Sequence, residues 1–168
     1  MKNFTLSLIL ILICIQLNSQ EKEMKIHNSI IQQVWKPFKK SFDTKDAKTF
    51  NSLHTDTVLR INAWGIKQGK AYKDGITKSY SKTSKKTRTI EFWIEQSVFS
   101  DSISHQIGYY AITYKEPKNK DKTSYAQFQV TLKKINRIWK ISQDFDTENV
   151  GGIKVDATFI KQLEKLHL

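Results

Sequence analysis

The stretch SYAQFQVTLKKINRIWKISQDFD, from Ser124 to Asp146, contains two runs of alternating apolar and polar residues around a turn. Alternation at period two places the apolar side chains of a strand on one face. In the first run these side chains are Ala126, Phe128, Val130 and Leu132. Asn136 lies between the runs and tolerates the positive φ angle that tight turns use. The stretch therefore predicts two antiparallel strands, Ser124–Lys134 and Arg137–Asp146.

Two more long strands precede this pair. Thr87 to Ser100 alternates in the same way, and the turn SDS separates it from a strand at Ile103 to Lys115. The inward residues of the first of these strands are Ile90, Phe92, Ile94 and Val98. The polar loop EPKNKDK, which starts at Glu116, leads into the final pair. Further upstream, Thr55 to Gly65 predicts a first strand closed by a glycine turn. Strands joined directly along the chain imply an antiparallel sheet.

The region before the first strand has helical periodicity. Met24 to Phe42 predicts an amphipathic helix, because its apolar residues recur every three or four positions. Pro37 lies inside this helix and is expected to kink or divide it. Asp43 or Thr44 is expected to cap a second short helix that runs to Leu53.

Two further helices complete the predicted order. One begins at Gln68 and has Ala71, Tyr72, Ile76 and Tyr80 on its apolar side. The other follows Gly151-Gly152, where Asp156 is expected to cap a terminal helix. Helices first, then one strand, a helix and a run of long strands indicate an α+β fold with helices on one face of the sheet.

The first twenty residues predict a signal peptide. Lys2 supplies a positive start, and the apolar run Phe4–Leu17 is too short for a membrane-spanning helix. We therefore expect residues 1–20 to be removed, with no transmembrane segment in the exported mature protein. A lipoprotein would use Cys14, but the bulky Ile13 precedes it. Cys14 is the one cysteine of the chain, so the mature protein has no disulfide and no thiolate nucleophile.

The formal net charge of +12 falls to +11 when Lys2 is removed with the signal peptide. All but three of the basic residues are lysines, whereas nucleic-acid sites usually rely on arginine. We therefore expect no nucleic-acid partner and interpret the lysines as a solvated surface. An acidic glycan, a lipid headgroup or an acidic partner is the alternative. The scattered histidines show no metal-binding spacing, so neither metal nor cofactor is expected.

Three stretches carry a resemblance to a known superfamily. They are AWGIKQGK (Ala63–Lys70), SHQIGYYAITY (Ser104–Tyr114) and WKISQDFD (Trp139–Asp146). Together with the order of elements, they resemble the nuclear-transport-factor-two-like superfamily, which includes SnoaL-like and ketosteroid-isomerase-like domains. The resemblance covers about Ile30 to Glu148, and its motifs are mostly structural.

The resemblance implies N-terminal helices packed in the concave face of a strongly bent antiparallel sheet. This arrangement is a cone with a central pocket, here assigned to residues 21–150, with residues 151–168 as an accessory C-terminal helix. Members of the superfamily commonly dimerise through the outer sheet face. We expect a homodimer here too, since Trp93 and Phe99 are expected to lie exposed on that face. Members include isomerases, cyclases, dehydratases and proteins without chemistry, so the fold does not settle the function.

The pocket is expected to be lined mainly by aromatic side chains. A pocket of this kind fits a mostly apolar small organic molecule, although aromatic stripes often simply fill a core. Tyrosine hydroxyls and two glutamines would supply its polar groups. The candidate ligand-binding residues are Trp35, Phe38, Trp64, Tyr80, Phe92, Gln96, Tyr110, Tyr114, Phe128 and Gln143.

Three residues are candidates for catalysis. Strict alternation with Trp139 and Ile141 would place Asp144, and Asp146 with it, on the outer face. A bulge near Gln143 would be needed to turn an acid inward, where its pKa would be raised. His54 and Asp56 lie between the second helix and the first strand. They are either structural residues at a helix end and a turn, or a catalytic histidine–aspartate pair at the pocket mouth.

These observations favour a non-catalytic module that binds a small ligand. A cofactor-free acid–base enzyme, such as an isomerase, cyclase or hydrolase, is the first alternative. A protein-interaction module of the cell envelope is the second. An inward carboxylate that faces an open cavity would favour the enzyme.

Overall fold

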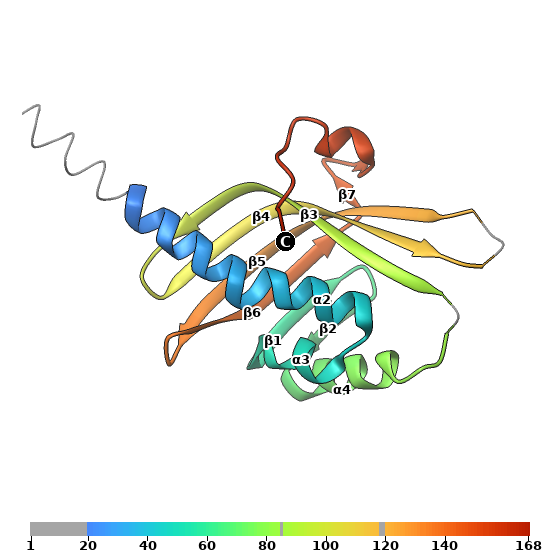
Figure 1. Cartoon of the computed structure of the whole chain (residues 1–168), viewed down its shortest axis with the longest axis horizontal. Helices are drawn as coiled ribbons and strands as arrows, with labels where there is room; N and C mark the ends of the chain where they lie inside the picture. The colour runs from blue at the N-terminus through green and yellow to red at the C-terminus, as the bar shows by residue number, and fades with distance from the viewer. Residues whose placement is uncertain (1–19, 85, 118–119) are drawn as a thin grey trace, which may run out of the picture.

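The structure is a computed structural model that describes residues 20–84, 86–117 and 120–168. The expected signal peptide lies outside these residues, apart from Gln20. The chain begins with a long helix that comprises helical residues 20–30, the π-helical segment η1 (Ile31–Trp35) and α2 (Lys36–Thr44). This N-terminal helix is the blue element in Figure 1. The short helix α3 (Ala47–Ser52) follows it.

Pro37 divides the N-terminal helix in an unexpected way. It lies in the first turn of α2, directly after the π-helical segment η1. A proline has no N–H to donate and crowds the preceding turn, so the wider π turn accommodates it without ending the helix. The change of hydrogen bonding leaves Val34 and Trp35 buried.

The cap of α3 differs from the two residues expected. Lys45 ends α2 in the left-handed conformation, at a φ angle of 57°. Asp46 then caps α3, and its side chain accepts a hydrogen bond from the Thr49 amide. Asp43 has another role: it pairs with Lys39 and accepts a hydrogen bond from the amide of Ile90 at 2.9 Å. It therefore fastens α2 to the sheet.

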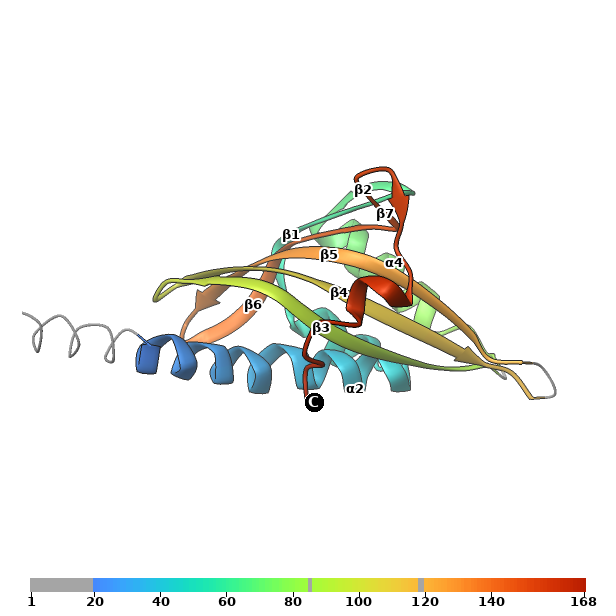
Figure 2. The same cartoon turned by 90° about the horizontal axis from the view of Figure 1, so that it is seen from above.

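The sheet has six strands in the order β2-β1-β6-β5-β4-β3. Their bounds are β1 His54–Asn62, β2 Gly65–Gln68, β3 Thr87–Phe99, β4 Ile103–Lys115, β5 Lys122–Ile135 and β6 Ile138–Thr147. The antiparallel run from β3 to β6 is confirmed. The sheet as a whole is mixed, however, because β1 pairs with β6 in parallel. The sheet bends over the N-terminal helix, as Figures 1 and 2 show.

Two details of the chain between β1 and β3 matter for the site. Gly65 does not end the strand region but opens the short strand β2, which pairs with β1. Helix α4 (Gly69–Tyr80) follows, and it buries Tyr72 and Tyr80 while Ala71 is exposed. The β1–β2 hairpin and α4 together form one side of the cone.

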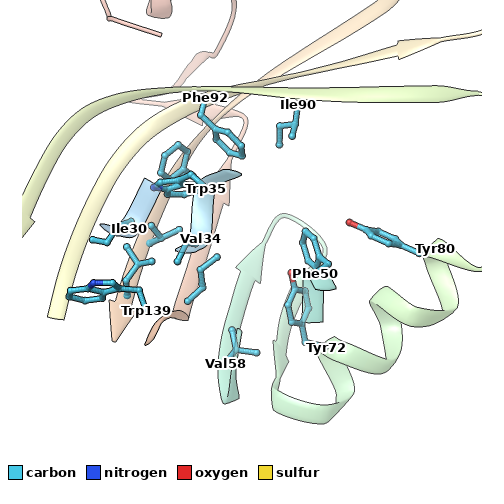
Figure 3. Close-up of a cluster of buried hydrophobic side chains, with 14 residues drawn as sticks. Ile30, Val34, Trp35, Phe50, Val58, Tyr72, Tyr80, Ile90, Phe92 and Trp139 are labelled. Atoms are coloured by element: carbon cyan, nitrogen blue, oxygen red, sulfur yellow. The ribbon is translucent and has the colours of Figure 1, made fainter. Parts of the chain in front are cut away.

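Side chains from the helices and the sheet meet in one core. Trp35 packs against Phe92, with ring centroids 4.9 Å apart, and both lie on the same side of the core in Figure 3. Phe50, Tyr72 and Tyr80 gather on the other side. The inward residues predicted for β5 are all buried. They are Ala126, Phe128, Val130 and Leu132.

The C-terminal segment is not the helix that we expected. After the small hairpin of β7 (Asn149–Val150) and β8 (Ile153–Lys154), only one 3₁₀ turn, η2 (Ala157–Ile160), is helical. Asp156 does cap this turn, by accepting a hydrogen bond from the Thr158 amide. The remaining residues run to the edge strand β3, where the Leu166 amide donates to Phe92 O at 2.9 Å. The segment therefore docks on the cone by backbone pairing.

This docking removes the physical reason that we gave for a dimer. Trp93, expected to be exposed, is 9% exposed, and it forms a bridge with Lys165 of the C-terminal segment. A bulge between Ile94 and Gln96 then shifts the alternation of β3. As a result Phe99 packs partly against the core, whereas Val98, expected to be buried, is exposed.

Candidate functional site

A pocket of about 420 Å³ opens between the helices and the concave face of the sheet. Its size is typical of small-molecule sites. Seven of the ten candidate ligand-binding residues line it. They are Trp35, Phe38, Trp64, Tyr80, Phe92, Tyr110 and Phe128. Trp64 is 83% exposed and lies in the turn between β1 and β2, so it contributes to the mouth of the pocket.

Three candidates lie elsewhere. Gln96 and Gln143 are exposed, because each follows a bulge that changes which residues of its strand face inward. Tyr114 is 39% exposed and is not among the residues that line the pocket. The polar groups of the pocket therefore come from other residues than the glutamines.

The bulge in β6 decides the chemistry of the pocket. Leu132 pairs with Ile141 and Thr131 pairs with Gln143, so Ser142 is an extra residue in β6. Its hydroxyl donates to the Thr131 carbonyl oxygen at 2.9 Å. One extra residue inverts the alternation of a strand. The expectation that Asp144 and Asp146 face outward is therefore wrong.

Asp144 and Asp146 line the pocket, where a single arginine holds both. Arg60 Nη1 lies 2.7 Å from Asp144 Oδ1, and Arg60 Nη2 pairs with Asp146 Oδ2. The Tyr110 hydroxyl donates to the same Asp146 oxygen at 2.9 Å. The three charged side chains are 11–15% exposed. We call Arg60, Tyr110, Asp144 and Asp146 the polar cluster.

Burial and ion pairing have opposite effects on the pKa values of Asp144 and Arg60. Burial raises the pKa of Asp144 above its ordinary value, and Arg60 opposes this rise without cancelling it. Burial also raises the pKa of Tyr110, and the hydrogen-bonded Asp146 raises it further, so the tyrosine stays a donor. Burial would lower the pKa of Arg60, but the two carboxylates raise it overall. One arginine faces two acids, so Asp144 is the group that can exchange a proton.

His54 and Asp56 do not form a pair. His54 is fully buried, its Nδ1 lies 2.8 Å from the Phe50 carbonyl oxygen, and burial lowers its pKa to about 4. Asp56 is exposed and pairs with Lys73 at 2.8 Å. Neither residue lines the pocket, so neither is a catalytic candidate in this structure.

Sequence reasoning missed the two arginines of the pocket. Arg60 lies in β1, and the sequence alone gives no reason to distinguish it from a surface residue. Its role becomes visible only when the pairing of β1 with β6 is known. Arg88 at the start of β3 has its guanidinium 3.9 Å from the Phe42 ring centroid and 4.4 Å from that of Tyr80. The scarcity of arginine in this lysine-rich chain was the one available signal.

No group of three or more His, Cys, Asp or Glu side chains in residues 20–84, 86–117 and 120–168 is arranged to hold a metal ion. Within the same ranges, no helix has the length and apolar character needed to cross a membrane.

Comparison with solved structures identifies the fold. An NTF2-like protein of unknown function from Shewanella oneidensis is 17% identical, with a TM-score of 0.59 over 72% of this chain and 98% of that one. An NTF2-like protein from Novosphingobium aromaticivorans is 8% identical, with a TM-score of 0.61 over 85% of this chain and 92% of that one. A Streptomyces avermitilis protein of the NTF2-like family, described provisionally as a dehydratase, is 12% identical, with a TM-score of 0.56 over 71% and 96%.

No family model and no curated protein matches the sequence. The structural neighbours nevertheless agree with one another, and the fold is that of the nuclear-transport-factor-two-like cone superfamily. The predicted α+β class with helices in the concave face of a bent sheet is confirmed. At these identities the likeness concerns the fold only, so the function must come from the pocket.

Proposed function

We propose that this protein binds a small, mostly apolar organic molecule in its central pocket. The observation that carries the proposal is the combination of an aromatic lining with the polar cluster on one wall. Aromatic and aliphatic side chains supply contact area, and a few fixed polar groups orient the ligand. Oxygens of Asp144 and Asp146 that Arg60 and Tyr110 leave free would accept hydrogen bonds from it.

Calorimetric titration with a panel of small aromatic alcohols, amides and acids tests this proposal. We expect at least one probe to bind, and Trp64→Ala to weaken its binding because Trp64 lies at the pocket mouth. An exposed tryptophan contributes little to stability, so this variant should stay folded. Tyr110→Phe removes the hydrogen bond that holds Asp146 in place and should weaken binding by about 0.5–1.5 kcal/mol, the net value of one hydrogen bond. If every probe fails to bind at millimolar concentration, the proposal is wrong.

Acid–base catalysis without a cofactor is the second candidate function, and the inward turn of β6 favours it. Our reason for expecting no chemistry was that Asp144 faces outward, and the bulge at Ser142 removes that reason. A carboxyl group whose pKa is raised above its ordinary value holds its proton more readily and is a better candidate for proton transfer. Asp146, held by Arg60 and Tyr110, would then stay an acceptor and fix the geometry.

Asp144→Asn separates binding from catalysis. The amide keeps the shape of the side chain but cannot accept and return a proton. If the protein is an enzyme, a probe that it converts should bind to this variant and stay unconverted, as followed by NMR of the probe. Asp74→Asn is the control, since Asp74 is exposed on α4 and pairs only with Lys70. Conversion at the normal rate by Asp144→Asn would exclude the catalytic role.

We also propose that the chain is exported and that it dimerises. Export is supported by Lys2 and the apolar run Phe4–Leu17, and we expect cleavage after Ser19 or Gln20. N-terminal sequencing of the isolated protein tests this, and a chain that keeps the apolar run would refute it. The dimer rests on the resemblance to the superfamily, and sedimentation equilibrium should show about twice the monomer mass.

A further inference from the structure

Arg88 is an anomaly in the wall of the pocket. Its Nε donates to the Phe42 carbonyl oxygen at 2.9 Å, and its guanidinium lies between the Phe42 and Tyr80 rings. Its Nη2 is closed off from solvent and has no hydrogen-bond acceptor. Among the residues that the structure describes, no acid forms an ion pair with it. A guanidinium nitrogen that is closed off from solvent and has no acceptor is unusual, because its desolvation is not compensated.

Tyr80 provides a second unused donor beside this arginine. The side chain comes from the last residue of α4 and is 8% exposed. Its hydroxyl is also closed off from solvent and has no hydrogen-bond partner. In Figure 3 this hydroxyl points away from α4, in the direction of Ile90 on β3. Burial raises the pKa of Tyr80 to about 12, although the neighbouring Arg88 guanidinium acts to lower it, so the hydroxyl faces Arg88 and keeps its proton at neutral pH.

The carboxylate of Asp43, which acts on Tyr80, already has hydrogen-bond donors of its own. Asp43 influences Tyr80 electrostatically, but its two oxygens accept hydrogen bonds from the Ile90 amide and from Lys39 Nζ. The two acids of the polar cluster lie farther away, because β5 and β4 separate their strand β6 from β3 in the sheet. Arg60 there is matched by two carboxylates, whereas Arg88 is matched by none.

We infer that the pocket takes an organic anion, whose carboxylate accepts hydrogen bonds from Arg88 Nη2 and the Tyr80 hydroxyl once these two side chains turn toward the cavity that they line. This inference rests on the proposed ligand-binding function and adds the charge and orientation of the ligand. A carboxylate offers several lone pairs at the end of an apolar body, and guanidinium groups bind it well. The aromatic lining would hold that body, and its far end would point to the polar cluster.

Three matched probes test the inference by calorimetry on the isolated, folded protein. They are naphthalene-2-carboxylate, naphthalene-2-carboxamide and 2-naphthylmethylamine, which share one ring system and differ in the charge of the head group. We expect the carboxylate to bind about tenfold more tightly than the amide, as one charge-assisted hydrogen bond provides. The amine should bind more weakly than either, because Arg88 repels it.

Two variants locate the anion. Arg88→Gln should remove the preference for the carboxylate over the amide, and Tyr80→Phe should reduce it severalfold. Tyr80→Phe deletes one hydroxyl that has no partner, so it decides the question if Arg88→Gln does not fold. Arg137→Gln is the control, since Arg137 is an exposed arginine in the turn between β5 and β6.

The outcomes separate the two proposals. Equal binding of carboxylate and amide would overturn the anion subsite and leave the ligand pocket intact. A preference that persists in Tyr80→Phe and in folded Arg88→Gln would place the anion elsewhere and also overturn the subsite. If none of the three probes binds, the subsite and the pocket function fail together.

Discussion

Arg60 and Asp144 are direct neighbours across the parallel ladder of β1 and β6, and their side chains meet at 2.7 Å. This relationship joins the first strand of the chain to the last long one. It also sets the charge of the pocket wall, because the same guanidinium reaches Asp146.

Removal of the shared arginine should be strongly destabilising. Arg60→Met leaves two carboxyl groups in a largely buried site without their counter-ion, and we expect a loss of about 3–5 kcal/mol. Urea unfolding at neutral pH measures this loss. The triple variant with Asp144→Asn and Asp146→Asn should recover much of it, since no buried charge then remains. A loss of less than 1 kcal/mol in Arg60→Met would mean that water screens the cluster.

Asp144→Asn should change how stability depends on pH. Burial raises the folded-state pKa of Asp144 above its ordinary value of 3.8, so the folded protein binds this proton more tightly than the unfolded chain. Stability from this group is present below the unfolded pKa and is lost as pH rises through the folded one. Relative to the wild type, the variant should therefore gain stability as pH rises from about 4 to neutral. Asp74→Asn, at an exposed aspartate of α4, is the control.

His54 should destabilise the fold in acid. Burial lowers its pKa from 6.5 to about 4, so the unfolded chain binds its proton first. Stability should fall as pH drops from about 6.5 through 4, by roughly 3 kcal/mol in total for a fully buried group. Thermal unfolding of His54→Phe, which cannot take up the proton, should lack this part of the pH dependence. His105→Gln, at an exposed histidine, is the matched control.

The two glycines Gly108 and Gly75 should respond in opposite directions to alanine. A Cβ atom on Gly108 would lie 2.2 Å from the Trp93 carbonyl oxygen and 2.8 Å from Phe128 Cζ, so Gly108→Ala should cost about 1–3 kcal/mol. A Cβ atom on Gly75 meets only Lys67 Nζ at 3.8 Å, and Gly75→Ala in α4 should gain about 0.5–1 kcal/mol. Urea unfolding midpoints measure both effects. A shift of the two midpoints in the same direction would contradict the prediction.

Deletion of residues 161–168 should weaken the fold without abolishing it. The segment covers Trp93, and its Leu166 and Leu168 pack partly against the core, so we expect a loss of about 2–4 kcal/mol. Unfolding should stay cooperative, because the remaining cone keeps all six strands of the sheet and its core. Tryptophan emission should shift to the red as Trp93 becomes exposed. Failure to fold at all would show that the segment belongs to the core.

The sequence predicted the fold better than the site, for a physical reason. Alternation in β5 and the positive φ of Asn136 depend on neighbours in the chain, and both predictions are confirmed. The inward turn of Asp144 depends on one extra residue, Ser142, which has no mark in the sequence. We expected that an acid could turn inward only if a bulge lay near Gln143, and the structure has that bulge at Ser142.

Long-range pairing was the other limit. The role of Arg60 requires the parallel contact of β1 with β6, and no local sequence pattern predicts that contact. The covering of Trp93 likewise requires the C-terminal segment to reach the edge of β3. Local patterns predicted which residues are buried in β5 and in the parts of β3 and β6 before their bulges, but only tertiary contacts decide which polar groups meet.

The parallel contact of β1 with β6 also has a consequence for the order in which the protein folds. Arg60 and Asp146 lie 86 residues apart in the chain, whereas β3 to β6 join neighbours through short turns. Closing a long loop costs entropy before its contacts form, so we expect the hairpins to form first and the β1–β6 contact last. Until that step, Asp144 and Asp146 stay hydrated. The acids of the finished pocket would then keep the half-folded sheet soluble.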